Sequence, residues 1–495
     1  MSAITLTPGE GWTGRLIARH FGWLVAAAVL AIGLLLGYAI ASPALARIVL
    51  GVAVSGLLVA WVFIDRDKAI PAVVVYLVLL GALRRWLSFE LGSLSNADPL
   101  LAVGPLVTAA LFLVAARRGA FRERNKLTSV VLLITVLGVV GSVNPLQGSL
   151  AAALPGMVIF LVPILWFWIG RTLVDDRKLA QVYAIVGGLA VLAAVYGIAQ
   201  SVGFFFSFDQ FWVDAVQDTY VSIKVGRGVV RGFGFASSAA EYGKLLGLAV
   251  AIYGARFLTR RNGSRLVYPA LGLVLGVALL LSALRTTTVL TVVACGALYG
   301  AQKGASITRV LCLGVAGVIV LVLGLSLLGP RFGEDNVGVL VERQVSGLSD
   351  PLNPGESTLG QHGNLVVRAV QGAITTPTGQ GTATITIAGK KFGESQAGDM
   401  DAADAAIAFG VVGIYAYVML CWRLGLRAYT VAVRRRDWLA LAALGVGIVS
   451  SLQWLNGGLY TIGPLAWMTF GWLDRRANAD VAAGDLEPQA AVAAT

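Results

Sequence analysis

Long apolar runs separated by short polar segments dominate the hydrophobic pattern of this chain. Runs close to 20 apolar residues predict membrane-spanning helices, because a helix satisfies its own backbone hydrogen bonds inside hydrocarbon. About fourteen are predicted, near 23–42, 46–64, 69–83, 99–116, 127–142, 152–170, 179–201, 236–255, 266–284, 286–301, 308–329, 404–422, 438–454 and 458–473. We therefore expect an all-α integral membrane protein, a polytopic bundle of about 12–14 transmembrane helices with one large extracytoplasmic loop.

Two longer polar segments interrupt this pattern, at 203–235 and at 330–403. A long segment between spans is usually a lid or a binding loop rather than a connector. In chain order, the sequence predicts a cytoplasmic N-terminus (1–22), a transmembrane region (23–329) that includes the outer loop 203–235, a large extracytoplasmic loop (330–403), C-terminal transmembrane helices (404–474) and a cytoplasmic tail (475–495).

Composition and charge agree with a membrane protein, since 57% of the 495 residues are hydrophobic and only 13% are charged. Lysine and arginine set the predicted orientation, because they are enriched in cytoplasmic segments. With the N-terminus inside, 25 of the 38 basic residues fall in inner segments and 13 in outer ones, so both termini are predicted to be cytoplasmic. This topology and attraction to anionic membrane lipid account for the net charge of +12, and no nucleic-acid partner is expected.

Acidic residues are scarce within the predicted spans, where only Glu241 and Asp404 fall at or just inside a helix. Transporters driven by protons or sodium normally carry buried carboxylates or broken helices near the middle of the membrane. This observation weakens a transporter function without excluding it. The sequence also contains no His or Cys cluster and no Walker glycine-lysine loop, so no metal or other cofactor is expected.

Arginines on the predicted outer face are the best candidates for chemistry. Arg227 and Arg231 lie in the first outer loop, Arg285 lies at the outer end of a helix, and Arg368 lies in the large loop. Several guanidinium groups on one face suit a phosphate or diphosphate, because each can bind two oxygens. A single outer arginine often just reaches for lipid phosphates. Their positions beside glycine, serine or threonine favour a shared anion site.

The large loop adds glycines and possible bases. Gly379 and Gly381 form a Gly-x-Gly after a proline, where the backbone can approach a ligand, although a plain turn is the commoner explanation. Asp399 and Asp401 precede the next helix, where capping of its N-terminus and a catalytic function both stay open. His362 is a further candidate for a general base near neutral pH.

Taken together, these residues resemble the O-antigen ligase and O-antigen polymerase superfamily, polytopic glycosyltransferases of bacterial surface polysaccharides. The matching elements are, in order, Arg231-Gly232-Phe233-Gly234-Phe235 before a helix, Leu281-Ser282-Ala283-Leu284-Arg285-Thr286 at a helix end, Arg368 with Pro377-Thr378-Gly379-Gln380-Gly381, and Gly410-Val411-Val412-Gly413. Many members carry a histidine at the end of the large loop, where this chain has Asp399. This departure favours a polymerase over a ligase.

The resemblance implies a GT-C-like enzyme of the bacterial cytoplasmic membrane, independent of metal, that transfers a glycan from a polyprenyl diphosphate donor to a glycan acceptor with inversion. Polysaccharide export or chain-length proteins are implied partners. The implied site consists of Arg231, Arg285, Arg368 and Arg227 on the diphosphate, the backbone of Gly379 and Gly381 in the loop, and Asp399, Asp401 or His362 as the base. Three alternatives stay open: a ligase that moves the glycan to a lipid or protein acceptor, a lipid-linked-oligosaccharide flippase or other transporter, and a non-catalytic assembly partner of a polysaccharide export system.

Overall fold

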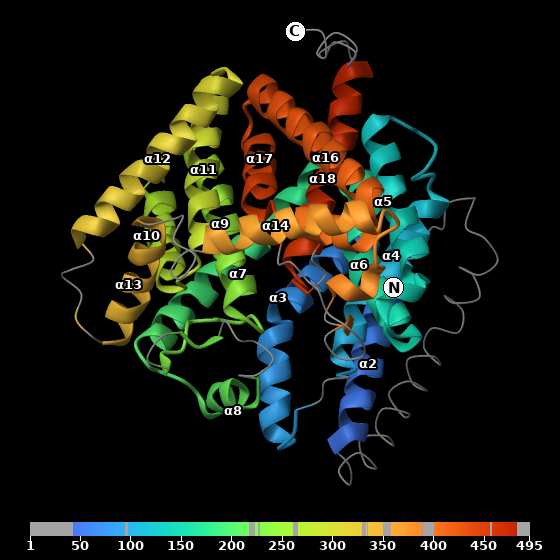
Figure 1. The fold of residues 1–495 in the computed structure, drawn as a ribbon, viewed down its shortest axis with the longest axis horizontal. Helices are drawn as coiled ribbons and strands as arrows, with labels where there is room; N and C mark the ends of the chain where they lie inside the picture. Colours follow the sequence, from blue (N-terminus) through green and yellow to red (C-terminus); the bar gives the residue numbers. More distant parts are fainter. Residues whose placement is uncertain are drawn as a thin grey trace, which may run out of the picture.

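The computed structural model describes residues 43–94, 98–216, 223–225, 228–260, 266–328, 333, 335–349, 358–386, 388–389, 400–455 and 458–482. Within these residues every regular element is a helix, and Figure 1 shows the helices gathered into one bundle. The all-α architecture predicted from the hydrophobic pattern is therefore confirmed. The first predicted span, 23–42, and the end of the tail, 483–495, lie outside the described residues.

Each of the other predicted spans corresponds to a helix. These helices are α2 (Pro43–Ile64), α3 (Arg66–Glu90), α4 (Leu100–Arg117), α5 (Lys126–Ser142), α6 (Ala153–Leu173), α7 (Asp176–Ser201), α9 (Ala239–Thr259), α10 (Val267–Leu281), α11 (Arg285–Gln302), α12 (Ile307–Leu328), α16 (Asp401–Arg435), α17 (Trp438–Ser450) and α18 (Ile462–Ala482). In the described part of the chain, seven helices are long and apolar enough to cross a membrane. They support a multi-pass membrane protein.

The two polar segments contain helices that the hydrophobic pattern did not predict. The segment 203–235 contains α8 (Ser207–Val216), and the segment 330–403 contains α13 (Asn336–Ser349), α14 (Thr358–Thr375) and the short helix η6 (Thr382–Ile385). Figure 1 shows α14 lying across the long helices rather than along them. Both α13 and α14 have one apolar face, and this face packs on the bundle. Two further short helices, η1 (Pro145–Gln147) and η2 (Leu150–Ala152), join α5 to α6.

Side chains of aspartate and asparagine fix where several helices begin at the predicted cytoplasmic end. Asp65, Asn125, Asp175 and Asp437 each accept a hydrogen bond from a backbone N–H in the first turn of α3, α5, α7 and α17. The first turn of a helix has N–H groups without a partner inside the helix, and such a cap satisfies one or two of them. These residues therefore place the helix ends that the apolar runs only approximate.

Glycines allow α6 and α18 to pack closely. A Cβ on Gly170 would lie 2.1 Å from the carbonyl oxygen of Met468, and a Cβ on Gly471 would lie 1.9 Å from that of Phe167. Backbone contact of this kind gives strong van der Waals attraction between helices in a membrane, where no hydrophobic driving force acts between them. The aromatic ring of Phe167 also packs edge-on against Trp467. This helix pair forms part of the buried core of the bundle.

Candidate anion-binding site

A short turn before α9 presents Arg231. Lys224 and Val230 form an isolated antiparallel bridge, and the backbone N–H of Arg231 donates to the carbonyl oxygen of Ile223 at 3.0 Å. Gly228 lies within this turn with φ of +74°, a left-handed conformation that glycine adopts without strain. The turn therefore fixes the backbone position of Arg231.

Buried polar side chains of α3 and α7 hold the glycine-rich segment that follows the turn. Arg85 donates to the carbonyl oxygens of Gly234 at 2.6 Å and Ala236 at 3.0 Å. The side-chain oxygen of Gln200 accepts the backbone N–H groups of Phe233 at 3.0 Å and Gly234 at 2.8 Å. Buried backbone groups need such partners, so these two side chains stabilise an otherwise irregular segment inside the protein.

Asp209 of α8 completes this support. Its Oδ1 lies 3.3 Å from Nε of Arg85, and both side chains are 0% exposed. Its Oδ2 accepts hydrogen bonds from Tyr196 and from Gln200, the latter at 3.2 Å. One carboxylate therefore links α3, α7 and α8, and through Arg85 it orders the segment next to Arg231.

Three arginines, Arg231, Arg285 and Arg343, gather at one place and are called here the arginine cluster. Arg285 begins α11, and its Nε donates to the carbonyl oxygen of Arg343 in α13 at 2.8 Å. The side chain of Arg231 is only 4% exposed, and its Nε is buried without a hydrogen-bond partner. Like charges held together in a buried position are unfavourable until an anion joins them. The arrangement is therefore suited to binding a polyanion.

The electrostatics of the cluster agree with this role. The pKa of Arg231 is lowered to about 9, first by burial and then by the positive charges of Arg343 and Arg285. Burial also lowers the pKa of Arg343. Leu284 precedes α11 and gives it no side-chain cap, so the partial positive charge of this helix end adds to the cluster. With a pKa of about 9, Arg231 remains charged at neutral pH.

The helix α13 is fixed over the start of α11 by apolar and polar contacts. Val339 and Leu340 are buried in a cluster with Ala283, at the end of α10. The side-chain amide of Gln344 donates to the hydroxyl of Thr288 in α11 at 2.8 Å. These contacts bring Arg343, which follows directly after this apolar face, to the start of α11.

Backbone strain marks the same place. Ala283 has φ of +53°, a left-handed conformation that is costly for a residue with a Cβ. It forms the sharp turn between α10 and α11, two residues before Arg285. A glycine would relieve the strain, so the surrounding contacts must hold this conformation. This unfavourable conformation therefore lies at the turn that positions Arg285.

The glycines of the Gly-x-Gly sequence contact another part of the chain. Gly379 has φ of +71°, and a Cβ there would lie 2.3 Å from the carbonyl oxygen of Ala408 in α16. Gly410 interrupts α16 with φ of +62°, and a Cβ there would lie 2.0 Å from the carbonyl oxygen of Pro377. The sequence suggested that a ligand approaches this backbone, whereas in the structure the kinked helix α16 does so.

Hydrogen bonds across the kink confirm this contact. The backbone N–H groups of Gln380 and Gly381 donate to the carbonyl oxygens of Ile407 at 2.8 Å and Ala408 at 3.0 Å. The side-chain amide of Asn144 donates to the carbonyl oxygen of the neighbouring Gly379 at 2.9 Å. The break in α16 thus frees carbonyl groups that the segment 376–381 satisfies.

Asp401 has structural contacts. Its side chain is fully buried at the start of α16, where its carboxylate accepts the backbone N–H groups of Trp454 and of Leu455, the latter at 2.9 Å. Its own N–H donates to the carbonyl oxygen of Leu452 at 2.9 Å. These contacts stabilise the turn after α17 and engage the carboxylate of Asp401 in structural hydrogen bonds.

The remaining predicted residues lie apart from the cluster or outside the described residues. Arg368 lies on α14 with an exposed side chain, and within the described chain it makes no hydrogen bond or ion pair. His362 lies on the same helix, partly buried, with Nδ1 lacking a hydrogen-bond partner. Arg227 and Asp399 lie outside the described residues, so their proposed roles stay predictions.

Arg343 is the cluster residue that sequence reasoning did not single out. The spacing of Val337, Leu340, Val341 and Gln344 is that of a helix face, and it could have placed Arg343 on a packed helix. No model of a known protein family matches this chain, and no curated protein matches it. The candidate site therefore depends on its own residues for its interpretation.

Proposed function

We propose that this protein is a membrane glycosyltransferase, a polysaccharide polymerase that joins glycan repeat units linked to polyprenyl diphosphate. The observation that supports it most directly is the arginine cluster, in which Arg231 is buried with positive neighbours. A diphosphate ester carries negative charge and several oxygens, which guanidinium groups bind well. The proposal includes a GT-C-like arrangement, a site on the outer face of the bacterial cytoplasmic membrane and cytoplasmic termini.

The proposed reaction has one bond-making and one bond-breaking event. A hydroxyl oxygen of the acceptor glycan forms a bond to the anomeric carbon of the donor, and the bond from that carbon to the diphosphate oxygen breaks. The bonding electrons leave with the diphosphate, and the hydroxyl proton passes to a base, for which Asp399 and His362 are the candidates. Arginines fixed in advance stabilise the negative charge that develops on the leaving group.

Gly347 offers a test of Arg285 in which the arginine itself is not substituted. This glycine lies in α13, and a Cβ on it would lie 1.8 Å from Cζ of Arg285. Gly347→Ala should therefore displace the guanidinium group and lower the rate of glycan extension by about tenfold or more. The matched control is Gly372→Ala in α14, where no atom lies within 4 Å of the new Cβ. Equal extension rates for the two variants would show that Arg285 is not part of the site.

The affinity for the donor should fall at alkaline pH. The charged form of Arg231 binds the diphosphate, and its pKa of about 9 means that this form is complete at pH 7 and is lost as the pH rises through 9. Because a bound diphosphate raises this pKa, the affinity should fall by up to about tenfold per pH unit above that value. Titrations of polyprenyl diphosphate at pH 7 to 10.5 measure this effect. An affinity constant over that whole range contradicts the role of Arg231.

The proposed function is tested with purified protein in nanodiscs and a donor that carries one labelled repeat unit on polyprenyl diphosphate. A ladder of lengthening lipid-linked glycans, lost in Arg285→Ala, is the expected result. A single transfer to a lipid or protein acceptor would indicate a ligase instead. Movement of the labelled donor between the leaflets of proteoliposomes, without any new glycosidic bond, would make the protein a flippase.

A further inference from the structure

A second basic site lies at the predicted cytoplasmic end of the bundle. A pocket of about 490 Å³ opens between the start of α5 and the middle of α16. Its basic lining consists of Arg124, Lys126 and Arg423, and its apolar lining includes Val130, Tyr415 and Met419. The pocket thus has a cationic part and an apolar part, contributed by two helices that are far apart in the sequence.

The cations of this pocket have no anionic partner among the described residues. Within the described chain, the side chains of Arg124, Lys126 and Arg423 make no hydrogen bond or ion pair. The Nε of Arg423 is in addition buried without a hydrogen-bond partner. Cationic groups gathered without counter-charges favour binding of an anion.

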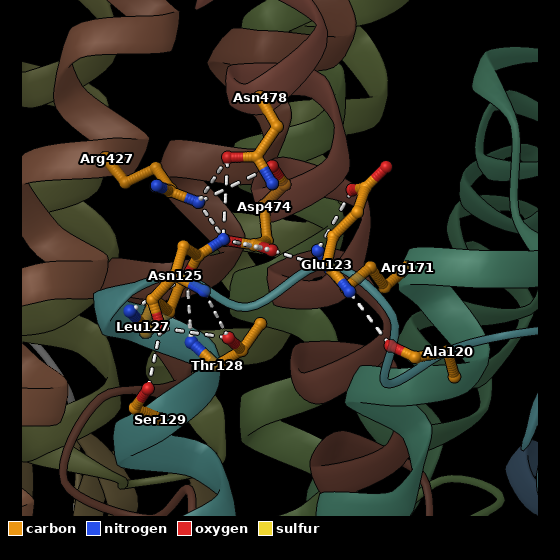
Figure 2. Close-up of polar contacts among 10 residues, drawn as sticks. All are labelled: Ala120, Glu123, Asn125, Leu127, Thr128, Ser129, Arg171, Arg427, Asp474 and Asn478. Carbon is orange, nitrogen blue, oxygen red and sulfur yellow. Dashed lines mark hydrogen bonds and ion pairs between the residues drawn. The ribbon is translucent and has the colours of Figure 1, made fainter. Parts of the chain in front are cut away.

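The neighbouring carboxylates of Asp474 and Glu123 already interact with other side chains, as Figure 2 shows. The buried carboxylate of Asp474 pairs with Arg427 and accepts Nε of Arg171 at 2.7 Å. The side-chain amide of Asn125 donates to both oxygens of Asp474, at 3.0 and 3.1 Å. Glu123 also lies 3.3 Å from Arg171. These carboxylates are engaged with other groups, so the pocket beside them keeps its positive charge.

The surface next to the pocket has the character of a lipid-facing one. Tyr415, Val418 and Trp422 follow one another along α16 and are 60%, 57% and 60% exposed. On α5, Leu132 and Val136 are also exposed. An apolar strip that ends with an aromatic residue beside basic groups is typical of the boundary between hydrocarbon and headgroups.

We infer that this pocket binds the phosphate of an anionic phospholipid from the surrounding membrane. The phosphodiester would lie among Arg124, Lys126 and Arg423, and the acyl chains would follow the apolar strip of α16. Basic pockets between transmembrane helices on the cytoplasmic side suit such headgroups, because each cation adds electrostatic attraction. The inference depends on the pocket and on the membrane location, and it is independent of the proposed transferase activity.

Native mass spectrometry of the purified full chain, titrated with phosphatidylglycerol or phosphatidylcholine, tests the inference. The wild type should retain phosphatidylglycerol in preference to phosphatidylcholine, and Lys126→Gln/Arg423→Gln should reduce this retention at least about tenfold. The control, Lys303→Gln/Arg309→Gln, removes the same charge at the end of α11 and the start of α12 and should retain the lipid. Arg124→Gln, at an exposed position, gives the same test if the double variant does not fold.

Three results would overturn the inference. The first is equal retention of phosphatidylglycerol in the pocket variant and in the control variant. The second is equal retention of phosphatidylglycerol and phosphatidylcholine by the wild type. The third is displacement of the bound lipid by inorganic phosphate at millimolar concentration, which would assign the pocket to a soluble anion.

Discussion

Arg231→Met is expected to abolish glycan extension while it raises the thermal stability of the protein. Extension should fall at least about 100-fold, because removal of one fixed donor from a developing anion typically costs that much. Stability, measured without added donor, should rise because a buried guanidinium beside other positive charges is unfavourable and methionine fills much of its volume. Extension assays and thermal unfolding of the same preparation measure the two effects.

Lys224→Met is the matched control for this prediction. Lys224 lies on the same turn as Arg231, bridged to Val230, and the substitution removes the same charge. We expect it to keep extension close to the wild type. If Arg231→Met lost stability together with activity, Arg231 would be a structural residue, and if it kept full activity the cluster would not be the donor site.

Asp209→Asn is expected to cause the largest loss of stability. It leaves Arg85 charged and buried without its partner, and breaking a buried ion pair costs about 3–5 kcal/mol. The hydrogen bonds from Arg85 to Gly234 and Ala236 depend on the position of this side chain. The segment after Arg231 should therefore loosen, and most of the protein should be lost as aggregate on mild heating.

The control for Asp209→Asn is on the same helix. Asp214→Asn makes the same chemical change at an exposed position of α8, where the carboxylate makes only long contacts, to Gln210, among the residues that the structure describes. It should leave the unfolding temperature unchanged, as most surface substitutions do. Size-exclusion chromatography of the two variants after heating measures how much folded protein each retains. Similar unfolding temperatures would show that the Arg85–Asp209 pair does not hold the segment.

The sequence predicted the helices well because the length of an apolar run is a local property. The span predicted at 69–83 was shorter than the helix α3, which extends to Glu90. The reason is that Arg84 and Arg85 continue the helix inside the protein, where Asp98 and Asp209 neutralise them. Those partners come from other segments of the chain, so no local pattern could indicate that these two arginines are buried.

Only part of the candidate site was predicted from the sequence, again because some contacts form between segments that are far apart in the chain. Arg231 and Arg285 were predicted from their neighbours in the sequence, and the structure brings them together. Arg343 joined them only because α13 folds onto the start of α11. Arg368 lies exposed on α14, and Gly379 packs against α16. Glycine predicts a close approach of the backbone, but the sequence does not show whether a ligand or another helix approaches.

If the arginine cluster binds a diphosphate, the protein should distinguish polyprenyl diphosphate from polyprenyl monophosphate. Both lipids can be titrated onto the protein in nanodiscs, with the wild type, Arg231→Met and Lys224→Met side by side. We predict that the wild type and Lys224→Met prefer the diphosphate by at least about tenfold, since the second phosphate adds charge-assisted hydrogen bonds. Arg231→Met should lose that preference. Equal affinity of the wild type for both lipids, or an unchanged preference in Arg231→Met, would show that the arginine cluster does not bind the diphosphate.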